Sequence, residues 1–162
     1  MPTPRKISHE YATGPERVAA LLRDPEFLKR RCEAAGEKNI EVTVEELPDG
    51  LRVVVSRDKE VELPGFAKRM FNANNRIVDD TRWRRQGEEW VGEYEVAITG
   101  VPGEVKGKST LAPSAQGCRY ESHFQVTSRI PLVGGKLEGW FADKLEETFR
   151  ANAQRNEEQL KS

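Results

Sequence analysis

The sequence lacks several features that would assign it to a well-defined class of protein. It has two cysteines in 162 residues, and Cys32 and Cys118 are too far apart to form a CxxC pair. We therefore expect neither a disulfide framework nor a thiolate metal site. No run of about 18 apolar residues is present, so no membrane-spanning helix is predicted. Lys and Arg total 26 against 27 Asp and Glu. This balance argues against a nucleic-acid partner, because phosphate contacts need a basic excess.

Sequence motifs for metal, cofactor or nucleophilic chemistry are equally scarce. There is no HExxH and no dinucleotide-binding glycine fingerprint, and no Ser or Cys is visibly paired with either of the two histidines. We predict no metal and no cofactor. The first residues lead into polar, alternating sequence rather than an apolar signal core, which predicts a cytoplasmic protein. The oligomeric state, monomer or homodimer, stays open.

The chain does contain clear hydrophobic periodicity, and its length suits one domain spanning residues 1–162. Residues 5–11 alternate as a half-buried strand. Two short helices follow. Thr13 and Glu16 are spaced as a capping box for the first helix. Asp24 precedes the second, which Gly36 is expected to end.

From residue 39 onward the apolar period is two. Six strands are predicted, at about residues 40–45, 51–55, 75–83, 90–98, 104–111 and 119–126. Each strand has one polar face, which is typical of an antiparallel sheet, and the short connections predict a meander. A last helix begins near Pro131. We expect the polar tail, about residues 152–162, to fray.

The apolar face of this last helix covers about half of its circumference, which suits a helix embraced by a curved sheet. Its members are Val133, Leu137, Trp140, Phe141, Leu145 and Phe149. The predicted fold is therefore α+β. A curved seven-stranded antiparallel sheet surrounds a long C-terminal helix, and two short helices lie between the first and second strands.

Five short motifs occur along the chain in an order and spacing that resemble one superfamily. They are His9-Glu10-Tyr11, Pro15-Glu16-Arg17-Val18, Asp24-Pro25-Glu26-Phe27, Leu63-Pro64-Gly65-Phe66 and Pro131-Leu132-Val133-Gly134-Gly135-Lys136. The chain resembles, over nearly its whole length, the START, polyketide-cyclase and major birch-pollen-allergen (SRPBCC) superfamily, in a bacterial branch of unknown function. The resemblance implies the helix-grip fold. It implies function only loosely, because members bind lipids, sterols, polyketides and hormones or act on them.

Strand parity predicts which side chains face the last helix. The candidate ligand-binding residues are Val55, Arg57, Phe66, Met70, Thr81, Trp83, Tyr94, Val96, Ser109, Ser122, Phe124, Leu137, Phe141 and Leu145. They form either the wall of a ligand cavity or an ordinary packed core. Residues 61–71 form either a lid over one end of the cavity or a loop packed on the edge of the core.

A few polar side chains share the predicted inner face. Arg57 and Asp79 fall on neighbouring strands, where they form either a polar patch that orients a ligand or a solvated ion pair at the end of the sheet. His9, Asp79 and Tyr94 are the available candidates for acid–base chemistry. No residue is assigned as catalytic.

Three functions fit these observations. The leading one is non-catalytic binding or carriage of a small hydrophobic or amphipathic ligand such as a lipid, polyketide or isoprenoid. The first alternative is an enzyme of the cyclase, aromatase or dehydratase kind. The second is a protein-interaction module that uses residues 29–31, 82–85 or 63–71, although a solvated face is the simpler interpretation of the two basic runs.

Overall fold

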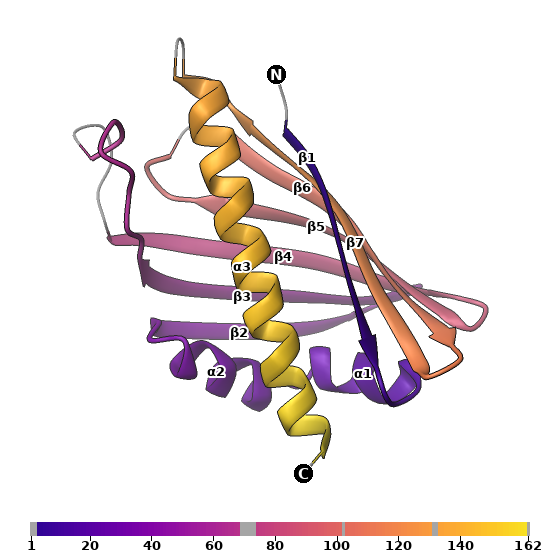
Figure 1. Ribbon diagram of the computed structural model, residues 1–162. Helices are drawn as coiled ribbons and strands as arrows, with labels where there is room; N and C mark the ends of the chain where they lie inside the picture. Colours follow the sequence, from indigo (N-terminus) through magenta and orange to yellow (C-terminus); the bar gives the residue numbers. More distant parts are fainter. Residues whose placement is uncertain (1–2, 69–73, 102, 131–132, 162) are drawn as a thin grey trace.

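The computed structural model describes residues 3–68, 74–101, 103–130 and 133–161. These residues form seven strands and three helices, in the order β1 (Thr3–Tyr11), α1 (Pro15–Leu22), α2 (Pro25–Ala34), β2 (Lys38–Leu47), β3 (Gly50–Glu60), β4 (Asn74–Gln86), β5 (Glu89–Ile98), β6 (Gly103–Ser114), β7 (Gly117–Ser128) and α3 (Gly134–Lys161). The strands make one antiparallel sheet in the order β1-β7-β6-β5-β4-β3-β2. The predicted helix-grip architecture is confirmed (Figure 1).

The register of the sheet shows why strand parity predicted the inner face correctly. Directly opposed residues of an antiparallel pair point to the same side. One such row crosses the sheet through Val53, Thr81, Tyr94, Gly107 and Phe124. Gly107 is needed in this row because a Cβ there would lie 2.3 Å from the ring of Tyr94. The aromatic ring thus lies flat across the neighbouring strand and reaches β7.

The two short helices begin differently. The Asp24 carboxylate accepts hydrogen bonds from the backbone N–H groups of Glu26 and Phe27, which caps α2 as its sequence predicts. The capping box predicted for α1 is wrong. Gly14 occupies the N-cap position, and no side chain caps that helix.

The C-terminal helix is longer than its sequence indicates. The chain does not fray after Ala151, as its polar composition predicts, but stays helical to Lys161. Polar side chains hold this last part of α3 in place. His9 on β1 is 2.7 Å from a carboxylate oxygen of Glu157, and Arg17 on α1 donates to the carbonyl of Leu160 at 2.7 Å. These polar contacts cannot be predicted from hydrophobic periodicity.

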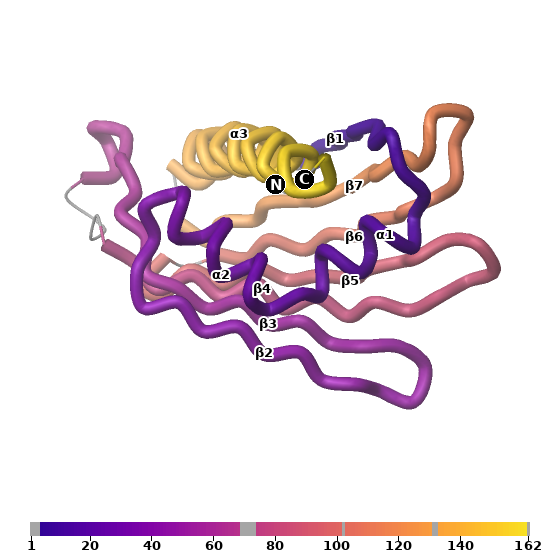
Figure 2. The backbone as a smooth tube through the Cα atoms, turned by 90° about the horizontal axis from the view of Figure 1, so that it is seen from below, coloured from indigo at the N-terminus to yellow at the C-terminus, as the bar shows by residue number. Residues whose placement is uncertain are grey.

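Two separate hydrophobic clusters fill the interior. One joins α1 and α2 to β3 and the far ends of β6 and β7, around Phe27, Leu28 and Leu111. The other joins the first half of α3 to β4–β7, around Phe124 and Leu137. The helix α3 packs most closely on β1 and β7, which form one flank of the sheet. Figure 2 shows the sheet curving away beneath α3, with α1 and α2 crossing its near end.

Candidate ligand-binding cavity

A cavity of about 670 Å³ lies between the two hydrophobic clusters. Its wall takes residues from both, for example Leu28 and Val53 from one and Ile77 and Phe141 from the other. The volume falls within the range of small-molecule sites, roughly 300–1,000 Å³. The space exists because α3 lies over β1 and β7, while β3, β4 and β5 face the gap beside it.

Most of the predicted ligand-binding residues line this cavity. Those that do are Val55, Arg57, Thr81, Trp83, Tyr94, Val96, Ser109, Phe141 and Leu145. Ser122, Phe124 and Leu137 are fully buried behind this wall, where they belong to the packed interior. The inner face of the sheet is therefore packed core near the start of α3 and cavity wall farther along that helix. Each of the two interpretations of this face holds for one part of it.

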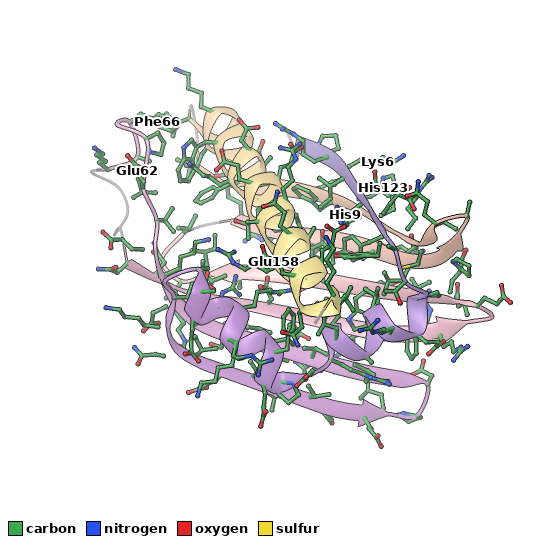
Figure 3. The ribbon with its side chains drawn as sticks, turned by 60° about the horizontal axis from the view of Figure 1, so that its bottom comes forward. Lys6, His9, Glu62, Phe66, His123 and Glu158 are labelled. Carbon is green, nitrogen blue, oxygen red and sulfur yellow. The ribbon has the colours of Figure 1, made fainter. Side chains whose placement is uncertain are left out.

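The described part of the loop after β3, residues 61–68, is divided between core and surface. Leu63 and Ala67 are buried in the cluster at the first half of α3, and Val61 also lines the cavity. Phe66 is 39% exposed and lies at the outer end of the loop, away from His9 (Figure 3). The remaining predicted ligand contact, Met70, lies outside the described residues, as does Phe71.

One end of the cavity carries a buried ion-pair network. The Arg57 guanidinium donates to the Asp79 carboxylate, and its Nε lies 3.5 Å from the Glu37 carboxylate. Burial alone would lower the pKa of Arg57, but these two carboxylates outweigh it, so the pKa is raised. The interpretation of Arg57 and Asp79 as a solvated ion pair at the end of the sheet is therefore wrong, because Arg57 is 7% exposed and lines the cavity.

Arg31 reaches the same end of the cavity from α2, although it is not among the predicted site residues. It stands in the run Lys29-Arg30-Arg31, for which a solvated face is the simpler interpretation. Lys29 and Arg30 are exposed, but Arg31 points inward and lines the cavity. Its helical spacing with Phe27, Leu28 and Cys32 is the signal that could have found it, since residues three and four apart share one face.

Arg31 begins a short chain of hydrogen bonds that crosses three elements. It donates to the side-chain oxygen of Asn156 on α3 at 3.1 Å, and the Asn156 amide donates to the hydroxyl of Tyr11 on β1 at 3.1 Å. Burial raises the pKa of Tyr11 to about 12, so its hydroxyl keeps its proton at neutral pH. Tyr11 also lines the cavity and can donate that proton.

A chain of four hydroxyl groups runs across β5, β6 and β7, beside and behind the cavity wall. Tyr94 is 2.8 Å from Ser122, Ser122 is 3.1 Å from Ser109, and Ser109 is 2.9 Å from Tyr120. Burial raises the pKa of both tyrosines, so all four groups stay neutral. Three hydrogen bonds use three of the four O–H donors, which leaves one donor outside the chain of hydrogen bonds. Tyr120, like Tyr94 and Ser109, lines the cavity.

The three acid–base candidates all border the cavity but belong to different contacts. Asp79 pairs with Arg57, and Tyr94 joins the hydroxyl chain. His9 is held by Glu157, and its ring meets the ring of Tyr11 at 4.6 Å between centroids. The described residues thus give each candidate a protein partner of its own rather than a shared reaction centre.

Sequence comparison places the chain in a family. A family model described as a protein of unknown function, DUF2505, matches residues 6–160. The chain belongs to the DUF2505 family. A comparison with curated proteins finds no match.

Solved structures share the fold of this DUF2505 protein at low sequence identity. TTHA0849 from Thermus thermophilus is 17% identical with a TM-score of 0.63, covering 98% of this chain and 95% of that one. Ara h 8.0201 is 12% identical with a TM-score of 0.59, covering 96% and 98%. Norcoclaurine synthase from Thalictrum flavum, solved with dopamine and hydroxybenzaldehyde, is 9% identical with a TM-score of 0.55, covering 99% and 87%. These likenesses confirm the helix-grip fold.

The helices of this DUF2505 protein give no indication of a membrane span. Within the described part of the chain, no helix combines the length and the apolar character needed to cross a membrane.

Proposed function

We propose that this DUF2505 protein binds a small amphipathic molecule in the cavity between the sheet and α3. The observation that supports this most directly is the cavity itself, a space of about 670 Å³ whose wall combines apolar side chains such as Ile77, Val96 and Phe141 with polar and charged ones. Burial of the apolar part of the ligand would drive binding, and the polar groups would fix its orientation. Norcoclaurine synthase, which shares the fold, was solved with two small aromatic molecules.

Filling the cavity tests this proposal. Thr81 is on β4 and points into the cavity, whereas Thr43 on β2 is exposed on the opposite face of the sheet. Thr81→Phe should occupy the space, and Thr43→Phe adds the same side chain where there is no cavity. The probe is N-phenyl-1-naphthylamine, a neutral molecule whose fluorescence rises in apolar sites. Native mass spectrometry of freshly purified protein would show any ligand that co-purifies.

We expect the wild type and Thr43→Phe to bind the probe equally and Thr81→Phe to bind it at least about tenfold more weakly, because side chain and probe compete for one space. Any co-purified mass should be lost from Thr81→Phe only. Equal probe binding by all three proteins would show that the cavity is not the binding site. Far-ultraviolet circular dichroism confirms that the variants are folded.

A further inference from the structure

Arg31 is half-buried and differs from the buried Arg57 in having no carboxylate partner. Among the described residues, no Asp or Glu oxygen lies within 4 Å of its guanidinium, and its hydrogen bond goes to the neutral amide of Asn156 at 3.1 Å. Arg57, in contrast, has both Asp79 and Glu37. Arg31 lines both the main cavity and a smaller adjoining pocket of about 270 Å³.

A guanidinium in this position keeps its charge. Burial lowers the pKa of Arg31, yet arginine does not lose its proton in proteins. A guanidinium has five N–H donors, and one of those on Arg31 is used by Asn156. Holding an unpaired charge away from water is costly unless an anion and further hydrogen bonds compensate it. Among the described residues no carboxylate lies within ion-pair distance of Arg31, and the nearby charge of Asp79 does not outweigh the effect of burial on the pKa of Arg31.

The charged side chains around Arg31 indicate how much negative charge a ligand would need to balance them. Among the charged side chains that line the smaller pocket, Arg31, Arg57 and Lys59 carry three positive charges, and Glu37 and Asp79 carry two negative ones. The difference is a single positive charge, and it lies on the arginine without a partner. A group with one negative charge would balance it.

Two charged residues of α3 at the rim of the smaller pocket, Glu147 and Arg155, have opposite signs and leave this difference unchanged. A carboxylate carries one negative charge, whereas a phosphate monoester carries nearly two at neutral pH. A carboxylate also matches the planar fork of a guanidinium, which can donate two parallel hydrogen bonds to it.

We propose that Arg31 is the residue that recognises an anionic head group in this cavity, and that the ligand is a monocarboxylate with an apolar body. This rests on the proposed function and specifies its ligand class. The carboxylate would lie against Arg31, within reach of the Tyr11 hydroxyl that lines the same cavity. The apolar body would extend along Ile77, Val96 and Phe141 toward the first half of α3.

Calorimetric titration with a matched pair of probes tests this assignment. Dodecanoate and dodecanol have the same alkyl chain and differ in the charge of the head group. Arg31→Met removes the inward guanidinium. Arg30→Met makes the same change on an exposed neighbour in α2 and is the control. Arg31→Lys keeps the charge but loses the fork.

We expect dodecanoate to bind the wild type and Arg30→Met equally and to bind Arg31→Met at least about tenfold more weakly, as for loss of a charge-assisted hydrogen bond. Arg31→Lys should fall between them. Dodecanol should bind the wild type and Arg31→Met within about twofold of each other. Arg31→Met also loses the hydrogen bond to Asn156, so it should melt somewhat below Arg30→Met, and the unchanged binding of dodecanol is the result that separates a ligand contact from a structural role.

Three outcomes would overturn the assignment. In the first, Arg31→Met binds dodecanoate as tightly as the wild type does. In the second, dodecyl phosphate binds the wild type more tightly than dodecanoate, which would point to a dianion. In the third, neither dodecanoate nor dodecanol binds any of the proteins. That result rejects the proposed function itself, whereas the first two leave it standing.

Discussion

Replacing Arg57 by methionine would remove the cation that two carboxylates share on the inner face of β3. Arg57 is 7% exposed and Glu37 is 9% exposed, so neither charge is well solvated. The Asp79 side chain is 34% exposed. Methionine keeps most of the length and volume of the arginine stem, so packing changes little. The main effect is that Glu37 and Asp79 lose the charge that compensates them.

The expected cost follows from the burial of the two carboxylates. Removing one partner of a buried ion pair typically destabilises a protein by about 3–5 kcal/mol. Asp79 is one-third exposed, and the Lys59 ammonium remains 3.7 Å from Glu37. Both facts place Arg57→Met at the lower end, at about 3 kcal/mol of unfolding free energy.

Urea denaturation at neutral pH measures this loss. With a slope of about 2 kcal/mol per molar urea for a domain of this size, the midpoint should fall by roughly 1.5 M. The control is Arg52→Met on the outer face of the same strand. Arg52 makes two hydrogen bonds to Asp80, of 2.9 and 2.7 Å, with side chains 36% and 32% exposed. Surface pairs contribute about 1 kcal/mol or less, so its midpoint should fall by no more than about 0.5 M.

Equal losses in the two arginine variants, both near 1 kcal/mol, would refute the reasoning, since burial would then not decide the cost. Single carboxylate variants refine the test. Glu37→Gln and Asp79→Asn each leave Arg57 with one carboxylate, so each should cost less than Arg57→Met. A larger loss of unfolding free energy in Asp79→Asn than in Arg57→Met would contradict the idea that Glu37 and Asp79 share the charge of Arg57.

Two further predictions concern glycine packing and the thiols. Gly107→Ala should cost about 1–3 kcal/mol in thermal unfolding because its Cβ would collide with Tyr94, whereas Gly139→Ala in α3, which meets nothing within 4 Å, should stabilise. Burial raises the pKa of Cys32 and Cys118 from 9.0 to about 11. Their stability contribution is therefore complete below pH 9 and is lost as the pH rises toward 11. Ellman's reagent at pH 8 should react far faster in urea than with folded protein.

Each of these two predictions has a clear contrary result. An unchanged melting temperature in Gly107→Ala would mean that Tyr94 can move aside without losing its hydrogen bond to Ser122. Rapid labelling of both thiols in the folded protein at pH 8 would mean that Cys32 and Cys118 are accessible as thiolates, contrary to their burial.

The inner face of the sheet could be predicted from sequence because side-chain direction in a strand is a local property. Parity alone placed Arg57 and Asp79 on the same face of neighbouring strands, and the two do pair there. Parity could not show how deeply they are buried. Their exposure depends on α2 and Glu37, which approach from another part of the chain.

Arg31 could not be assigned from sequence with certainty because two local rules give opposite answers. A run of three basic residues is usually solvated, whereas the spacing of Arg31 from Phe27 and Leu28 places it on the buried face of α2. The structure follows the helical spacing. The extent of α3 is a non-local feature too, since Asn156 and Glu157 are held by partners on α2 and β1 that lie more than 100 residues away in sequence.

The cavity and the unpaired charge occur at the same place, and together they support a ligand more strongly than either does alone. The apolar atoms that line a cavity lack protein contacts on one side, and a half-buried charge without an anion is unfavourable. Larger side chains at Thr81 and Ile98 could fill the space, and a neutral residue could replace Arg31, without a change of fold. A protein that keeps both features is less stable than it could be. An amphipathic monocarboxylate would relieve both, because its chain fills the space and its charge balances Arg31, and bound ligand stabilises the folded state by mass action.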